Sequence, residues 1–204
     1  MLFRLVRHED FPSDGTRTTS YGGWQRKMEE GPTTQRHKKE APDSVGFGVL
    51  VISTGVFAGR RRDSSGEMIA EMIRAAGHKV LSVRLVPDAP PEIRKGIEEL
   101  ADLPGVQVIV STGGTGLSPS DLTVETVRPL FQKEITGFLP LFMLLSYEDV
   151  GAACMLSRTT AGILRGPKPV LLFALPGSPK ACRLALEKLV LPEASHIIKH
   201  VEEI

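Results

Sequence analysis

Short apolar runs alternate with helical spacings of apolar residues in the chain after residue 45. The run Phe47–Ile52 has almost no polar interruption, which is typical of a strand covered on both faces. Met68–Ala76 places apolar residues at the three- and four-residue intervals of an amphipathic helix. A strand over Val80–Val86, a second helical spacing and a strand over Val106–Val110 follow. This order predicts a parallel sheet with helices on both faces.

The remaining pattern predicts further elements of the same kind. We expect helices over 124–131 and Phe142–Tyr147, and an extended segment over Met155–Gly162. Pro169–Ala174 is the last predicted strand. A closing helix should follow it, bent at Pro192, because proline cannot donate a backbone hydrogen bond.

Residues 1–44 have a different composition from residues 45–204. Glycine, proline, serine, threonine and charges of both signs dominate this segment, without a sustained apolar period. We therefore predict a disordered or weakly ordered extension over 1–44 and one folded domain over 45–204. Translation from an upstream start would give the same pattern.

Overall composition excludes several classes of protein. The apolar content of 41% and the charged content of 24% are those of a soluble globular domain. The net charge of +1 provides no basic field for nucleic acid. No uninterrupted apolar run approaches the length of a membrane span, so no membrane association is expected. Cys154 and Cys182 lack a CxxC spacing, which favours a reducing compartment and a cytoplasmic location.

The strongest candidate for chemistry is the glycine-rich segment after the third strand. Gly113, Gly114 and Gly116 permit positive φ angles and a close approach of backbone to a ligand. A glycine-rich turn between a strand and a helix presents backbone N–H groups to an anion. Asp121 adds one carboxylate to this segment. A tight structural turn without a ligand would have the same composition.

Two other strand ends should lie beside this glycine loop. Ligands of parallel α/β sheets bind at the carboxyl ends of the strands. Ser53–Asp63 and Pro87–Asp88 follow the first two strands, and Ser111–Asp121 follows the third. Within the first of these loops, Gly59–Asp63 is basic, and Ser64–Glu67 fits a capping box for the next helix.

A second glycine turn, Leu175–Pro179, follows the last strand. Ser178 suits the N-cap of the closing helix and Pro179 suits its first position. Walker-type phosphate loops, GxGxxG and GxSxG motifs are all absent from the sequence, which argues against the common nucleotide-binding and serine-hydrolase signatures.

These ordered segments resemble the molybdopterin-binding (MoaB/MogA) family of molybdenum cofactor biosynthesis, and within it the MoaB branch most. The resemblance extends from about Gly46 to His200. The blocks that carry it are Ile52-Ser53, Asp63–Gly66, Val86–Asp88, Thr112–Gly116 with Pro119 and Asp121–Thr123, Gly137-Phe138, Ser157-Arg158 and Leu175–Ser178; Leu144–Glu148 and Phe173–Arg183 point to the MoaB branch.

The resemblance implies a three-layer α/β/α fold with a mostly parallel five-stranded sheet. It also implies an enzyme that transfers AMP from Mg-ATP to the terminal phosphate of molybdopterin. A homotrimer or a dimer of trimers is implied as well, and other cofactor-biosynthesis proteins become candidate partners.

Site residues follow from the same resemblance. Asp88 and Asp121 match the family's two functional acids, which would position Mg²⁺ with ATP and activate the phosphate. The remaining candidates would bind ATP or molybdopterin: Thr112, Gly113, Gly114, Thr115 and Gly116 in the first turn, Ser157 and Arg158, and Pro176, Gly177 and Ser178 in the second turn. Two alternatives stay open, because Asp121 could cap a helix and Arg158 could lie in a subunit contact.

The sequence departs from the family pattern at two places. Thr54 follows Ser53 where the family usually has an aspartate, and Leu139–Met143 replaces a Gly-Glu pair and a later arginine. The apolar replacement could form an interface. A non-catalytic molybdopterin-binding or scaffold protein of the same fold is therefore the alternative function, and a domain acting on another nucleotide is a third.

Overall fold

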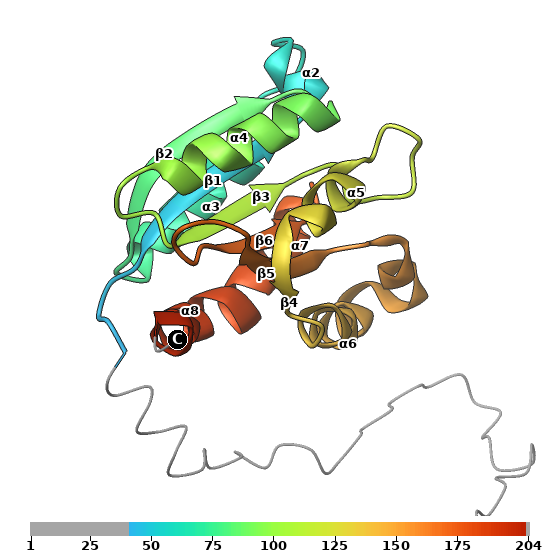
Figure 1. The fold of residues 1–204 in the computed structure, drawn as a ribbon. Coiled ribbons are helices and arrows are strands. Elements are labelled where there is room, and N and C mark those ends of the chain that lie inside the picture. The colour runs from blue at the N-terminus through green and yellow to red at the C-terminus, as the bar shows by residue number, and fades with distance from the viewer. Residues whose placement is uncertain (1–40, 203–204) are drawn as a thin grey trace, which may run out of the picture.

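A six-stranded mixed sheet in the order β2-β1-β3-β6-β5-β4 forms the middle layer (Figure 1). The computed structural model describes residues 41–202, so most of the predicted extension over 1–44 lies outside the described residues. The strands are β1 (Gly46–Ile52), β2 (Lys79–Val86), β3 (Val108–Thr112), β4 (Phe131–Glu134), β5 (Thr160–Leu164) and β6 (Leu171–Leu175). The first three strands and β6 pair in parallel, whereas β5 pairs antiparallel with both of its neighbours, β6 and β4.

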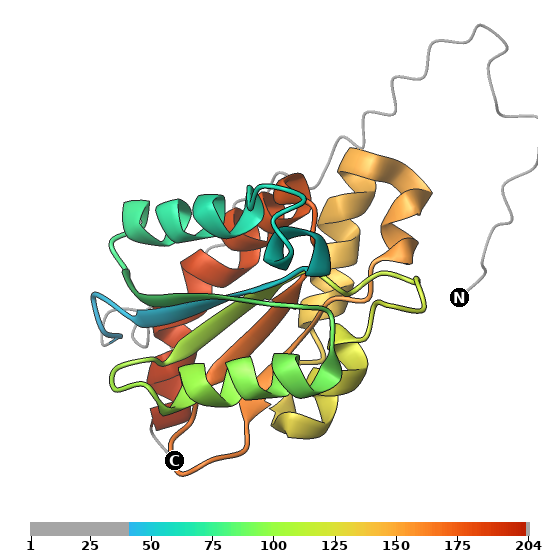
Figure 2. The same cartoon turned by 90° about the horizontal axis from the view of Figure 1, so that it is seen from above.

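Helices cover both faces of this sheet, and Figure 2 shows α3 on one face and α4 on the other. The helices are α2 (Thr54–Phe57), α3 (Ser65–Ala75), α4 (Pro90–Asp102), α5 (Thr123–Val127), α6 (Phe138–Val150), α7 (Pro179–Ala185) and α8 (Leu191–Glu202), with short helical segments η1 (Arg128–Leu130), η2 (Gly151–Leu156) and η3 (Leu186–Val190). Residues of α3, α6, α7 and α8 share one apolar core, and those of α4 and α5 share the other. The expected three-layer α/β/α fold is confirmed.

Alternate residues of each central strand supply the two cores. Val49 and Val51 of β1 point to the α3 face, whereas Leu50 and Ile52 point to the α4 face. Side chains alternate along a strand, so a strand between two helical layers must be apolar at nearly every position. All seven residues of β1 are buried, as the uninterrupted apolar run predicted.

The expected number of strands was wrong, because β4 was missed. The helical pattern over 124–131 ends earlier than expected, and Phe131 begins an edge strand instead. Only Phe131 is buried in β4, and the three polar residues after it are exposed. Such a strand leaves no alternating pattern in the sequence. The segment expected to be extended from Met155 is helical through η2, and β5 begins only at Thr160.

The closing helix is distorted just before Pro192. The segment η3 between α7 and α8 is a π-helical turn, and Pro192 is the second residue of α8. Proline lacks the N–H that would bond to the carbonyl of Lys188, so a local change of helical geometry is expected one turn upstream. The distortion predicted at Pro192 therefore begins one turn earlier.

Helix α6 is the one described segment that, together with η2, is long and apolar enough for a membrane span. Phe138–Leu156 has 19 residues, although Glu148 and Asp149 interrupt its apolar character. The α-helical part has 13 residues and ends at Gly151, whose φ of 61° breaks the helix. At about 1.5 Å per residue it is roughly 20 Å long, short of the ~30 Å hydrocarbon core. Its length therefore favours a surface helix.

Candidate functional site

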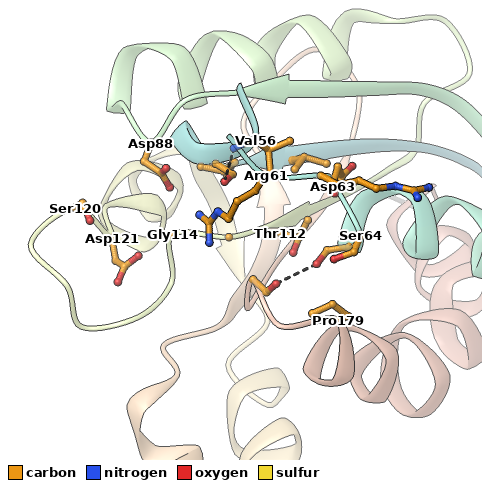
Figure 3. Close-up of a pocket in the computed structure, with 17 residues that line it drawn as sticks. Val56, Arg61, Asp63, Ser64, Asp88, Thr112, Gly114, Ser120, Asp121 and Pro179 are labelled. Atoms are coloured by element: carbon orange, nitrogen blue, oxygen red, sulfur yellow. Dashed lines mark hydrogen bonds between the residues drawn. The ribbon is translucent and has the colours of Figure 1, made fainter. Parts of the chain in front are cut away.

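A pocket of about 530 Å³ lies at the carboxyl ends of the parallel strands (Figure 3). Each predicted strand end contributes to it, as the parallel topology requires. Its polar lining comes from Ser53 after β1, Arg61–Ser65 before and at the start of α3, Asp88 after β2, Thr112–Gly114, Ser120 and Asp121 after β3, and Gly177 after β6.

Thr54 and Asp88 join the loops that follow β1 and β2. The Thr54 N–H donates to Asp88 Oδ2 at 2.6 Å, and the Asp88 N–H donates to Thr54 Oγ1 at 3.0 Å. Thr54, one of the two expected departures from the family pattern, thus accepts a bond that fixes the Asp88 backbone. No hydrogen bond within residues 41–202 engages Asp88 Oδ1, which lies beside Gly114.

Gly113 and Gly114 adopt conformations that require glycine. Their φ angles are 108° and 64°, in the region that other L-residues rarely occupy. A Cβ on Gly113 would overlap the Ile52 carbonyl oxygen, and one on Gly114 would overlap Thr123 Oγ1. Thr123 in turn donates its hydroxyl to the Gly113 carbonyl at 2.9 Å and its N–H to the Gly114 carbonyl at 3.0 Å. The first turn of α5 therefore fixes the glycine loop from behind.

Asp121 closes the turn that follows the glycine loop. Its Oδ2 accepts the Ser118 N–H at 2.9 Å, and its own N–H donates to the Ser118 carbonyl at 2.8 Å. A Cβ on Gly116 would lie 2.8 Å from Asp121 Oδ2, so a side chain there would displace the carboxylate. Leu122, not Asp121, is the N-cap residue of α5, and it forms no side-chain cap. The helix-capping alternative for Asp121 is therefore wrong.

Arg158 holds the glycine loop from its outer side. Its Nε donates to the Gly116 carbonyl and its Nη2 to the Asp121 carbonyl, both at 2.8 Å. The guanidinium also pairs with Glu125 and holds the pKa of that carboxyl below its usual value. Because the pKa of Glu125 is lowered in the folded state, the contact stabilises the protein fully at pH values above the usual carboxyl pKa. This stability is lost as the pH falls through the lowered pKa.

The second glycine turn lies against the first. A Cβ on Gly177 would lie 3.5 Å from Gly113 Cα. The Ser65 hydroxyl donates to the Gly177 carbonyl at 3.0 Å, and the Thr112 hydroxyl donates to the Pro176 carbonyl at 2.8 Å. Ser178 is the N-cap residue of α7, as predicted, but it forms no side-chain cap. Two turns that are distant in sequence therefore form one wall.

The capping of α3 differs from the predicted capping box. The Gly66 N–H donates to Asp63 Oδ1 at 2.8 Å, whereas the Ser64 side chain forms no cap. The start of α3 is thereby held at the pocket, where Ser64 and Ser65 line the wall.

The pocket includes half of the twelve predicted site residues. Those in its lining are Thr112, Gly113, Gly114, Asp88, Asp121 and Gly177. Those behind the lining or outside it are Thr115, Gly116, Ser157, Arg158, Pro176 and Ser178. Sequence reasoning placed the segments Ser53–Asp63 and Ser111–Asp121 beside the glycine loop but named none of their residues Ser53, Arg61, Arg62, Asp63 and Ser120 as a site residue. Ser64 and Ser65 of the lining were considered only as part of a helix start.

Fold and pocket together define an α/β protein with a pocket walled by two glycine turns at the strand ends. The family model described as a probable molybdopterin binding domain matches residues 48–196. This chain therefore belongs to the molybdopterin-binding family.

Individual relatives have names from cofactor biosynthesis. The chain is 42% identical over 170 residues to a molybdopterin adenylyltransferase of Pyrococcus furiosus, covering 83% of this chain and 98% of the relative. It is 41% identical over 162 residues to molybdenum cofactor biosynthesis protein B of Bacillus cereus, covering 79% and 93% of the two chains. The crystal structure of tungsten cofactor synthesizing protein MoaB from Pyrococcus furiosus matches with a TM-score of 0.74 at 40% identity, covering 79% of this chain and 99% of that one.

Gly114→Ala should destabilise the protein more than Gly59→Ala. Both glycines have similar positive φ angles, 64° for Gly114 and 68° for Gly59, so this backbone conformation should destabilise each alanine variant by about 1–2 kcal/mol. Only Gly114 is crowded, because a Cβ on Gly59 meets no atom within 4 Å. The overlap with Thr123 should add about 1–3 kcal/mol, measurable by urea denaturation. An equal decrease in the free energy of unfolding for the two variants would contradict the prediction, because it would show that the glycine loop accommodates the methyl group without strain.

One cysteine should react in the native protein and two after unfolding. Cys182 is buried beneath the glycine turns, its Sγ is 3.3 Å from Thr112 Oγ1, and burial raises its pKa to about 11. At pH 8 about one such thiol in a thousand is ionised, and the thiolate is the reactive form. Cys154 is partly exposed. Titration with a disulfide reagent checks this, and Cys154→Ser should remove the fast phase; a fast phase that persists in this variant would contradict it.

Proposed function

We propose that this protein is a molybdopterin adenylyltransferase, which transfers AMP from ATP to the terminal phosphate of molybdopterin. The observation that carries the proposal is the placement of Asp88 and Asp121 beside a cradle of two glycine turns. Relatives with this name or with names from molybdenum cofactor biosynthesis, similar over most of their length, support it.

The reaction needs two phosphate-bearing substrates in one pocket. A phosphate oxygen of molybdopterin attacks the α-phosphorus of ATP and forms a new P–O bond. The bond from that phosphorus to the oxygen bridging to the β-phosphate breaks, and pyrophosphate leaves. Because the protein takes no covalent part, its contribution is to position the phosphates and to stabilise charge. The backbone of Gly113 and Gly114, with Gly177 opposite, would provide that cradle.

Asp88 and Asp121 fit the Mg²⁺ ion that accompanies ATP. Each carboxylate uses Oδ2 to fix its loop, while Oδ1 has no hydrogen bond among the described residues. Mg²⁺ is commonly held by one or two carboxylates together with substrate phosphates, and it neutralises phosphate charge. Within residues 41–202 no group of three or more histidine, cysteine or acidic side chains is placed to hold a metal alone, so the phosphates would complete the site.

The scaffold alternative is weakened by the position of the apolar replacement. Leu139–Met143 lies in the first turns of α6 and is absent from the pocket lining. The apolar run therefore forms no part of the pocket wall within a single chain.

We also propose that the chain assembles as a homotrimer through α6, and that trimers can pair through β2. Leu141, Leu144 and Tyr147 are exposed on α6, and Leu81 and Val83 are exposed on the edge strand β2. These two apolar faces lie at opposite edges of the sheet, so both can be covered at once (Figure 1). Its free cysteines also fit a cytoplasmic enzyme.

Asp121→Asn should lower adenylyl transfer about 10²- to 10³-fold while the fold is kept. The asparagine oxygen can still accept the Ser118 N–H, but an amide nitrogen replaces the second oxygen and cannot bind a cation. Molybdopterin and Mg-ATP are incubated with the protein, and the adenylylated pterin is measured by chromatography.

Asp102→Asn, at the end of α4 and outside this pocket, serves as the control and should retain full activity. Undiminished transfer by Asp121→Asn would refute the role of Asp121. Absence of product from the unaltered protein, under conditions where an active relative works, would refute the proposed function.

Leu144→Glu should convert the oligomer to single chains, because it places a charge on a leucine that is 64% exposed on the α6 face. Light scattering should give three or six chain masses for the unaltered protein. Leu81→Glu on β2 should leave at least the trimer intact. A single chain mass for the unaltered protein would contradict the proposed assembly.

A further inference from the structure

Arg61 places a guanidinium in the pocket, and none of the interactions described above uses it. The Arg60 and Arg61 N–H groups both donate to the Gly55 carbonyl, at 2.9 and 3.2 Å, which fixes the loop after α2. Figure 3 shows the Arg61 side chain extending into the pocket towards Gly114. The charge is therefore directed at the anion cradle by the backbone of its own loop.

Gly55 provides the space in which this guanidinium lies. A Cβ on Gly55 would lie 2.7 Å from Arg61 Nε and 2.8 Å from Nη2. Gly55 has no positive φ, so its backbone conformation does not require glycine. The feature that glycine provides here is room for the Arg61 side chain.

The neighbouring arginines differ from Arg61 in their surroundings. Arg62 is 83% exposed and pairs with Glu67 at 2.8 Å, so its charge is already compensated. Arg60 is absent from the pocket lining. Arg61 forms no side-chain hydrogen bond or ion pair with any residue in 41–202. Among the described lining residues it is the base whose charge remains available.

Charge in the pocket explains why such a base is needed. Asp63, Asp88 and Asp121 line the same pocket and would repel a polyphosphate. A guanidinium offers a planar pair of N–H donors that matches two oxygens of one phosphate group.

We propose that Arg61 is a phosphate-binding residue of this site, which grips a substrate phosphate opposite the glycine loop, and that Gly55 keeps its position open. This inference rests on the proposed function for the identity of the substrates. The phosphate belongs either to the polyphosphate tail of ATP, which leaves as pyrophosphate, or to the terminal phosphate of molybdopterin.

The test measures binding separately from turnover. Calorimetry with pyrophosphate and with ATP is done on the full chain, and KM values for ATP and molybdopterin are measured alongside. If Arg61 holds the ATP tail, Arg61→Ala should weaken pyrophosphate and ATP binding about 10- to 100-fold. Arg61→Lys should recover only part of the loss, because lysine lacks the bidentate fork.

Gly55→Ala provides a second route to the same loss with the arginine still present. Its methyl group should displace the guanidinium, and because the displaced atoms end a flexible side chain, the fold should be kept. In the double variant Gly55→Ala/Arg61→Ala, the alanine at 55 should cause no further loss, since both changes act on one interaction. Arg60→Ala removes the same charge from the same loop outside the pocket, and should bind within about twofold of the unaltered protein.

Each outcome assigns or rejects the role. A raised KM for molybdopterin with unchanged pyrophosphate and ATP binding would place Arg61 on the pterin phosphate instead. Unchanged binding and unchanged KM values in Arg61→Ala would overturn the proposal, as would an equal loss in Arg60→Ala. Pyrophosphate binding that depends on Arg61 in a protein without transferase activity would support Arg61 and refute only the proposed function.

Discussion

The parallel register of β1, β3 and β6 is the constraint on which the site depends. Val51 pairs with Thr112, and Thr112 pairs with Leu175, so all three strands end at one level. Gly113 then lies between two carbonyls. Its N–H donates to the Leu175 carbonyl at 3.1 Å, and its Cα faces the Ile52 carbonyl. No side chain fits there, and the backbone itself becomes the pocket wall. The glycine requirement thus follows from strand pairing.

Hydrogen bonds between loops turn these strand ends into one rigid cradle. Thr54 fixes Asp88, Ser118 fixes Asp121, and Thr123 fixes the glycine loop. In both carboxylates a backbone N–H donates to Oδ2, so Oδ2 fixes the loop and Oδ1 is left without a hydrogen bond among the described residues. Arg158 stabilises the loop from outside the pocket, whereas Arg61 adds positive charge within it. The two arginines illustrate that one side-chain type can serve the scaffold or the substrate, depending only on where the fold directs it.

The departures from the family pattern affect different parts of the molecule. At the first departure, the Thr54 hydroxyl accepts the Asp88 N–H, so Thr54 holds Asp88 in place while lying outside the pocket lining itself. The apolar run Leu139–Met143 belongs to α6 and enlarges an exposed apolar face. The first change thus acts at the site and the second at a surface where another chain can pack.

Sequence alone determined the layered α/β architecture, because a central strand covered on both faces must be apolar at nearly every position. It also determined the glycine loop, the second turn and Asp88 and Asp121, since glycines and acids at strand ends leave a local signature. Tertiary structure decided the edge strand β4, whose single buried residue, Phe131, gives no periodic pattern. It also decided which side chains face the pocket. The candidate Arg158 stays behind the loop, and Arg61, which was no candidate, enters, because side-chain direction depends on contacts between segments far apart in the chain.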